Sequence, residues 1–126
     1  MEFEAYSYPA VEGALFSILI PTWNNLAYLQ LCVSSLRRHS THAHQIIVHV
    51  NDGSDGTLDW VRAEGIDHTH SRENIGVCFA LNAAASLAQT SYIAFFNDMI
   101  REQVAVYHGW HRSGLVQASL CVNKGL

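Results

Sequence analysis

The sequence has 126 residues, of which seven are Lys or Arg and eleven are Asp or Glu, so its formal net charge is −4. This length is typical of a single domain, and the acidic balance excludes a broadly basic surface for nucleic acid or for a charged membrane. Hydrophobic residues make up 49% of the chain and charged residues 14%, a composition that argues against a disordered protein.

Cysteine usage favours a reducing compartment. The three Cys form no C-x-x-C pair, which argues against a disulfide scaffold, a zinc site of that type and a thioredoxin-like motif. The first residues, Met1 to Glu4, are acidic and lack the basic region of a secretory signal. No run approaches the roughly 18 apolar residues that a membrane span needs. We therefore expect a cytoplasmic protein without a transmembrane span.

Four short segments predict β-strands. Residues 14–20, 45–50 and 92–96 are nearly continuous apolar runs rich in β-branched and aromatic residues, which is typical of strands buried on both faces of a parallel sheet. We expect the first run to end at Pro21. Residues 66–70 alternate between apolar and polar and predict a weaker, edge-like strand.

Helical patterns lie between these strands. Apolar spacing predicts a first helix over residues 26–38, with Asn24 or Asn25 as its N-cap. A second, short helix is expected from residue 54 or 55 to Gly65. A third covers residues 76–89 and contains small residues that permit close approach to a sheet.

The order β-α-β-α-β-α-β predicts an α/β fold, an open and mostly parallel sheet with flanking helices. We expect one domain over residues 1–126. Residues 1–13 are interpreted as an irregular lead-in and residues 14–100 as the core. Residues 101–126 carry little pattern and hold at most a helix around 113–122.

Polar clusters directly follow three of the predicted strands, at residues 21–24, 51–54 and 97–98. Ligands of open α/β sheets bind outside the carboxyl ends of the strands. We therefore expect the three clusters to meet on one rim of the sheet. The alternative is that each cluster is ordinary turn and helix-cap chemistry, for which Asn, Asp, Gly and Ser are common.

Four segments in chain order also match a known pattern. Residues 17–24 read SILIPTWN, residues 50–57 VNDGSDGT, residues 74–82 NIGVCFALN and residues 92–98 YIAFFND. In this order and spacing they resemble the P-T-Y-N loop, the V-D-D-G-S-x-D-G-T segment, the N-x-G-x-x-x-A-x-N helix and the D-x-D strand of family 2 glycosyltransferases, which have the GT-A fold. The resemblance implies the Rossmann-like nucleotide-binding half of such an enzyme, truncated before its acceptor-binding half.

The resemblance further implies a site for a nucleotide-diphosphate sugar of the UDP or dTDP type. Thr22 and Asn24 would lie against the nucleotide, Asp52 would face the base or ribose, and Arg72 would help to neutralise the diphosphate or hold the base. The complete donor-binding set implied is Pro21, Thr22, Trp23, Asn24, Asn51, Asp52, Gly53, Arg72, Asn82, Asn97 and Asp98.

Some of these residues have a second interpretation. Asn51 stands where the family usually has the first of two acids, although an amide can still form hydrogen bonds. Arg72 is equally consistent with a solvated surface arginine. Asn82 either reaches the donor site or satisfies a neighbouring backbone group.

The resemblance also implies Mg²⁺ or Mn²⁺ at the diphosphate, with Asp98 as its protein ligand. The sequence departs from the family there, because the triplet reads Asn97-Asp98-Met99 and a thioether is a poor partner for a hard cation. We therefore expect a weakened metal site. No catalytic residue is assigned, since the nearby titratable candidates, Glu102, His108 and His111, match no family position.

Two functions remain open from the sequence. The first is metal-assisted, inverting transfer of a sugar from a nucleotide-diphosphate donor to an acceptor hydroxyl. The second is a non-catalytic or degenerate domain that binds a nucleotide or a protein, lacks the acceptor half and pairs as a homodimer or with a missing C-terminal half. The paired histidines, including His68 and His70, have no third ligand at a diagnostic spacing, so we interpret them as surface or loop residues rather than a zinc site.

Overall fold

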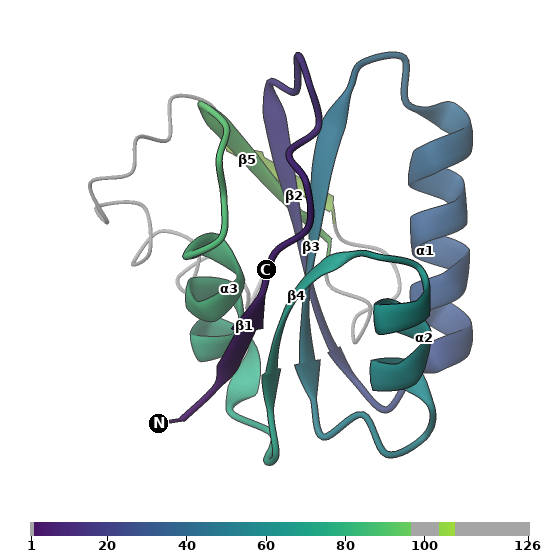
Figure 1. Cartoon of the computed structure of the whole chain (residues 1–126), viewed down its shortest axis with the longest axis vertical. Helices are drawn as coiled ribbons and strands as arrows, with labels where there is room; N and C mark the ends of the chain where they lie inside the picture. Colours follow the sequence, from purple (N-terminus) through teal and green to yellow (C-terminus); the bar gives the residue numbers. More distant parts are fainter. Residues whose placement is uncertain (1, 97–103, 108–126) are drawn as a thin grey trace.

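The computed structural model describes residues 2–96 and 104–107, whose strands form one six-stranded sheet in the order β1-β4-β3-β2-β5-β6 (Figure 1). Strand β2 pairs in parallel with β3 and β5, and β3 pairs in parallel with β4, while β1 and β6 add antiparallel at the two edges. The expected open, mostly parallel α/β sheet is confirmed. The strands are β1 Glu4–Tyr6, β2 Phe16–Trp23, β3 His44–Asn51, β4 Asp67–Ser71, β5 Tyr92–Phe96 and β6 Val104–Tyr107.

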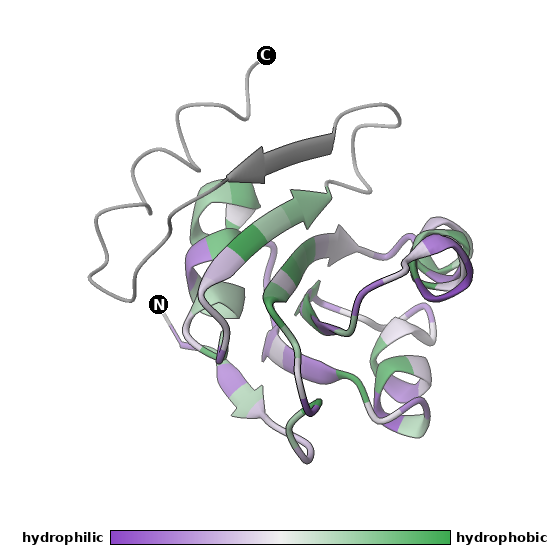
Figure 2. Cartoon of the chain, turned by 90° about the horizontal axis from the view of Figure 1, so that it is seen from above, coloured by the Kyte–Doolittle hydropathy of each residue, from purple (hydrophilic) through white to green (hydrophobic). Residues whose placement is uncertain are grey.

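Helices cover both faces of the sheet. Helix α1 (Leu26–His39) and helix α2 (Thr57–Ala63) lie on one side, and α3 (Gly76–Ala85) lies on the other (Figures 1 and 2). The sheet is therefore the middle of three layers, which explains why its central strands are apolar on both faces. No helix in the described part has the length and apolar character that crossing a membrane requires.

The core consists of two apolar clusters, one on each face of the sheet. Side chains alternate along β2, so Leu19 packs toward α3 while Ile18 and Ile20 pack toward α1 and α2. On the α3 side the helix contributes small residues, including Ala84, which lets it lie close to the strands. In Figure 2 the green, apolar strands run between the two helical layers.

The chain turns into α2 by a capping contact. The helix begins at Thr57 rather than at residue 54 or 55, because Gly56 has a left-handed backbone with φ 99°. The Asp55 carboxylate accepts the Thr57 N–H at 3.1 Å through Oδ1 and the Leu26 N–H at 3.2 Å through Oδ2. Asp55 thus links the starts of α1 and α2, while Asn25, at the expected N-cap of α1, makes no side-chain capping bond.

Helix α3 is four residues shorter than the predicted span 76–89. After Ala85 the backbone tightens, with the Leu87 and Ala88 N–H groups each bonded to the carbonyl three residues back. The Ser86 hydroxyl also donates to the Ala83 carbonyl at 2.6 Å. These bonds satisfy the final carbonyls of the helix and end it.

Three expectations about strands are corrected. The lead-in 1–13 contains β1, which pairs with β4, so β4 is an interior strand rather than an edge. Strand β2 continues through Pro21 to Trp23. Among the described residues the pairing of β2 with β5 stops at Leu19, whereas its pairing with β3 continues, and sheets tolerate proline where one side is unpaired.

The C-terminal segment also differs from expectation. The pattern of residues 101–126 predicts no strand, yet β6 pairs antiparallel with β5, from Phe96 opposite Val104 to Ile93 opposite Tyr107. A strand of four residues, Val-Ala-Val-Tyr, gives too short a pattern to identify alone. The helix predicted around 113–122 lies outside the described residues.

Candidate functional site

The carboxyl ends of β2, β3 and β4 meet at one rim of the sheet. Trp23 is in register with Asn51, and Asn51 with Ser71, so the three strands end side by side. The polar segments 21–24 and 51–54 are therefore neighbours, as the strand pattern predicts. The third predicted cluster, Asn97 and Asp98, lies outside the described residues.

Asn24 and Asp52 form the centre of this rim. The Asn24 side chain donates from Nδ2 to Asp52 Oδ2 at 2.9 Å and accepts the Gly53 N–H at 3.0 Å. Asn24 and Asp52 both have left-handed backbones, with φ 43° and 62°, a conformation that Asn and Asp tolerate better than most residues. The two loops thus hold each other through side chains and are oriented before any ligand arrives.

The Asp52 carboxylate is ionised and partly open to solvent. The hydrogen bond from Asn24 lowers the pKa of Asp52 below its ordinary value, and bonds from Ser54 lower it further. The Ser54 N–H donates to the other carboxylate oxygen, Oδ1, at 3.3 Å. A negative charge with exposed oxygen atoms is a suitable acceptor for hydroxyl or N–H groups of a ligand.

Gly53 shapes the loop beneath Asp52. Its φ is +83°, and a Cβ at this position would stand 2.7 Å from Val50 Cγ1 and 3.0 Å from Leu58 Cβ. The residue is buried. Its place in the site is therefore the close packing of the turn on β3 and α2, since it has no side chain and presents little surface.

Asn51, which the resemblance places in the donor-binding set, is fully buried. Its Nδ2 donates to the Thr22 carbonyl at 3.1 Å, and its Oδ1 accepts the Ile75 N–H at 2.9 Å and the Ser71 hydroxyl at 3.2 Å. One amide therefore ties the ends of β2 and β4 to the start of α3. Asn51 positions the rim from below.

The other predicted residues divide by exposure. Pro21 and Thr22 are buried in β2, whereas Trp23 and Asn24 stand exposed at its end. Trp23 is 48% exposed, which leaves much of an indole ring available to a ligand. Asn82 lies on α3, and its Oδ1 is buried without a hydrogen-bond partner among the described residues. Thr22 Oγ1 is likewise buried and has no hydrogen-bond partner there.

A buried histidine supports the rim from the α3 side of the sheet. His49 Nδ1 lies 2.7 Å from Thr69 Oγ1, and its Nε2 lies 3.0 Å from Ser71 Oγ. Burial lowers the pKa of His49 to about 4, so the ring is neutral at pH 7. Ser71 in turn contacts Asn51, which connects this histidine to the rim. The sequence interpretation did not single out His49, whose polar partners, Thr69 and Ser71, lie on the next strand.

The expectation that the histidine pairs lie at the surface is wrong for His68, which is fully buried. Its ring stacks on Tyr6 of β1 with 4.9 Å between centroids. His70 is half-buried, and its Nε2 lies 2.8 Å from the Asp52 carbonyl oxygen. Within the described residues no group of three or more His, Cys, Asp or Glu side chains could hold a metal ion.

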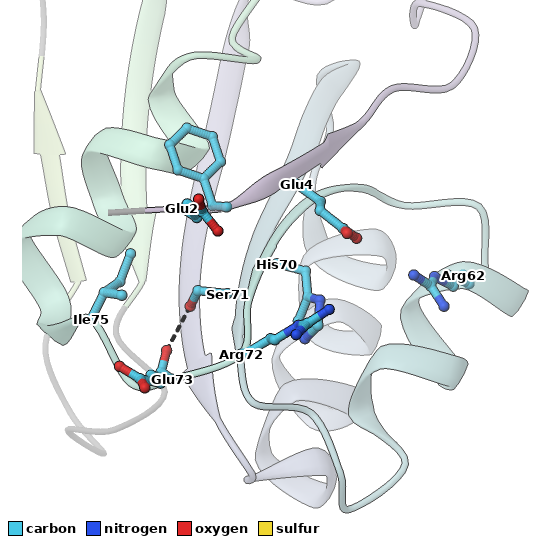
Figure 3. Close-up of a pocket in the computed structure, with 9 residues that line it drawn as sticks. Glu2, Glu4, Arg62, His70, Ser71, Arg72, Glu73 and Ile75 are labelled. Carbon is cyan, nitrogen blue, oxygen red and sulfur yellow. Dashed lines mark hydrogen bonds between the residues drawn. The ribbon is translucent and has the colours of Figure 1, made fainter.

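Arg72 lies in a cleft of about 970 Å³ beside the rim (Figure 3). The cleft lies between the N-terminal segment, α2 and the end of β4. In Figure 3 the side chains of Glu4, His70 and Arg62 enter the same space from β1, β4 and α2. Arg72 is exposed and forms no ion pair with another described residue. The lining residues are Glu2, Phe3, Glu4, Arg62, His70, Ser71, Arg72, Glu73 and Ile75.

Several solved structures have the same fold as this chain. They include residues 1–349 of TarS from S. aureus (TM-score 0.57, 21% identity over 67% of this chain) and glucosyl-3-phosphoglycerate synthase from Mycobacterium tuberculosis, solved with Mn²⁺, UDP and glucosyl-3-phosphoglycerate (TM-score 0.56, 17% identity over 68%). A third is the mannosyltransferase PcManGT from Pyrobaculum calidifontis, solved with GDP-Man and Mn²⁺ (TM-score 0.60, 18% identity over 71%). At these identities the likeness shows the fold.

The chain spans 27–34% of the length of these three structures. No curated protein sequence gives a significant match. The sequence pattern of Glycosyl transferase family 2, however, matches residues 17–98, which run from the second residue of β2 through β5 and include every rim residue described above. With that match over more than half of its length, and with the GT-A fold around it, the chain belongs to glycosyltransferase family 2.

Proposed function

We propose that this chain binds a nucleotide-diphosphate sugar at the carboxyl rim of its sheet and serves inverting transfer of the sugar to an acceptor hydroxyl. The observation that carries the proposal is the Asn24–Asp52 pair, which presents an ionised carboxylate at the joined ends of β2 and β3. Family membership and the nucleotides in the names of two similar structures, GDP-Man and UDP, support the same function.

Each rim residue has a proposed role in donor binding. Asp52 accepts hydrogen bonds from ribose hydroxyls or from a base N–H. Trp23 offers an aromatic face at the end of β2, and Arg72 offers a positive charge for the diphosphate or base. Asn82 would use its unpartnered Oδ1 toward the donor side, and Asn97 would contribute next to Asp98.

Metal assistance is part of the proposal and rests on Asp98. The rim carboxylates that the structure describes are already engaged: Asp52 accepts from Asn24 and Ser54, and Asp55 caps the starts of two helices. They do not form a metal site, so the protein ligand for Mg²⁺ or Mn²⁺ would be Asp98, together with the diphosphate. Such a cation would stabilise negative charge on the departing diphosphate.

The remaining parts of the proposal concern the rest of the reaction. Transfer needs a general base within hydrogen-bond reach of the acceptor hydroxyl. We propose that the base and the acceptor site come from a second subunit or from polypeptide beyond the described residues, and that residues 1–126 act as one domain. We also propose a cytoplasmic location, which the sparse, scattered cysteines of the sequence favour.

Calorimetric titration with UDP and with GDP, each with Mg²⁺ and with a chelator, tests donor binding. We expect measurable binding of at least one nucleotide, and we expect Asp52→Asn to weaken it about tenfold, because a charged acceptor is lost. Asp59→Asn is the matched control, since it removes an equal charge from an exposed position of α2. Asp98→Ala should remove the enhancement by metal and leave the affinity without metal unchanged.

Two results would contradict this proposal. Equal nucleotide affinity in Asp52→Asn and in the parent chain would remove Asp52 from the site. A folded chain that binds neither nucleotide and forms a dimer would instead support the alternative, an interaction domain without donor binding.

A further inference from the structure

The cleft in Figure 3 has one wall that the family pattern does not include. That pattern begins at residue 17, whereas the wall consists of Glu2, Phe3 and Glu4. Antiparallel pairing of β1 with β4 places Glu4 directly opposite His70. Residues directly opposite in adjacent strands have their side chains on the same face, so Glu4 stands over the same cleft as His70.

Tyr6 links the Glu4 part of this wall to α2 and β4. The Tyr6 ring stacks on the buried His68, and the Arg62 guanidinium lies 5.4 Å from the centre of the Tyr6 ring. The Tyr6 hydroxyl also donates to Glu4 Oε2 at 2.9 Å. The Glu4 side chain is therefore held by one of its oxygen atoms, and Oε1 makes no hydrogen bond to another described residue.

The cleft opens directly beside the proposed donor site. His70 Nε2 contacts the Asp52 carbonyl oxygen, and the Asp52 N–H donates to the Ser71 carbonyl at 2.8 Å. These contacts make the cleft a neighbour of Asp52, so a nucleotide held by Asp52 would have this space beside it. With a volume of about 970 Å³, the cleft is at the upper end of the roughly 300–1,000 Å³ of small-molecule sites.

The lining offers strong acceptors and strong donors together. The carboxylates of Glu2 and Glu4 come from the N-terminal wall, and the guanidinium of Arg72 comes from the segment after β4. Phe3 is 42% exposed and supplies an apolar ring. A flat ligand with N–H donors on one edge and acceptors on another would match the carboxylates, the guanidinium and the aromatic ring of this lining.

Guanine has this arrangement. Its N1–H and N2 amino group donate to a carboxylate, its O6 and N7 accept from an arginine, and its ring stacks on an aromatic side chain. Uracil offers a single N–H, and adenine places its acceptor N1 where guanine has a donor. We propose that this cleft is a base subsite which selects guanine, with Glu4 as the specificity-determining residue; this rests on the proposed binding of a nucleotide diphosphate.

Titration of the full chain with GDP, UDP and inosine diphosphate tests the inference. Inosine diphosphate lacks the N2 amino group, so it isolates the contact with a carboxylate. We expect GDP to bind about tenfold more tightly than UDP or inosine diphosphate, the size of effect expected of one hydrogen bond to a charged group. Glu4→Gln should weaken the affinity for GDP about tenfold, so that GDP and inosine diphosphate bind equally well. The affinity for UDP should stay within about twofold of its value in the parent chain.

Glu12→Gln is the matched control, because Glu12 is an exposed residue of the same N-terminal segment outside the cleft. It should leave all three affinities unchanged. UDP binding as tight as GDP would overturn the guanine subsite and leave the proposed function standing. A Glu4→Gln variant that still prefers GDP over inosine diphosphate would also overturn the guanine subsite and leave the proposed function standing. Absence of binding by every nucleotide would overturn both the subsite and the proposed donor site.

Discussion

Residues at the rim are of two kinds. Exposed residues can contact a ligand, and buried residues hold the exposed ones in position. Asp52 and Asn24 are open to solvent and bonded to each other, whereas Asn51 is fully buried beneath them. The family usually carries an acid where this chain has Asn51. In this structure an amide suits the position better than an ionised acid, because Nδ2 donates to the Thr22 carbonyl and a carboxylate has no proton to give.

Asn51→Asp tests this preference without changing the size of the side chain. At pH 7 the ionised carboxylate of the variant would place a buried charge against the Thr22 carbonyl, so we expect a loss of about 2–4 kcal/mol in the free energy of unfolding. Burial would raise the pKa of the new carboxyl, so the protonated form is favoured in the folded state. The loss should therefore shrink as the pH falls from about 7 toward 5, which denaturant titrations at each pH would measure.

Asn24→Asp is a useful comparison for that experiment, since this side chain is exposed. It places a second acid beside Asp52 in solvent, where charges interact weakly. We expect a smaller loss of stability. A loss for Asn51→Asp that is equally small, or that does not change with pH, would contradict the assignment of Asn51 as a buried link between strand ends.

The sequence predicted part of this site, for reasons visible in particular residues. Asn24 and Asp52 follow strands that are apolar on both faces, so their meeting at the rim follows from strand order. The burial of Asn51 could not be predicted from the sequence, because its hydrogen-bond partners come from three other segments of the chain. Glu4 was not foreseen either, since a residue of the lead-in reaches the cleft only through pairing with a distant strand.

At the scale of elements, the long apolar strands and amphipathic helices were predictable, and the short edge strands were not. Strands β2, β3 and β5 bury apolar side chains on two faces, which leaves a strong pattern in the chain. Strand β1 is the tripeptide Glu-Ala-Tyr, with all three residues exposed, and its place is set by contacts across the sheet. The pattern underestimates the length of β2, because proline commonly ends a strand but lies inside this one.

The attachment of β1 through one aromatic residue gives a prediction for this element. Tyr6→Ala removes the stack on His68 and the contact with Arg62, so we expect β1 to detach more often while the central strands stay intact. Hydrogen exchange by NMR should show faster exchange at the backbone amides of β1 and unchanged exchange in β3.

Leu31→Ala is the control for this measurement, because Leu31 is 66% exposed on α1 and far from β1 in the chain. It should leave exchange in β1 as it is in the parent protein. Unchanged protection of β1 in Tyr6→Ala would show that the backbone pairing alone holds the strand. An equal acceleration in β3 would show that β1 and the core unfold as one unit.

For the molecule as a whole, two buried histidines link folding to pH. Burial lowers the pKa of His49 to about 4 and also lowers that of His68, so in the folded protein both rings bind protons less readily than in the unfolded chain. The contribution of neutral His49 to the free energy of unfolding is full above pH 6.5 and is lost as the pH falls toward 4. It is lost because, over this range, the unfolded chain binds the proton and the folded protein does not. One unit of pKa corresponds to about 1.4 kcal/mol, so His49 alone accounts for about 3 kcal/mol across this range.

His49→Gln isolates that contribution. The amide of glutamine can replace the hydrogen bonds to Thr69 and Ser71 but does not titrate. We expect the variant to lose less stability than the parent protein between pH 6.5 and about 4, with the slope that remains coming from His68 and the carboxylates. Urea unfolding at half-unit steps of pH measures both proteins in the same buffers. Parallel curves would show that the pKa of His49 is the same in the folded and unfolded protein, which would contradict a buried His49 ring with a lowered pKa.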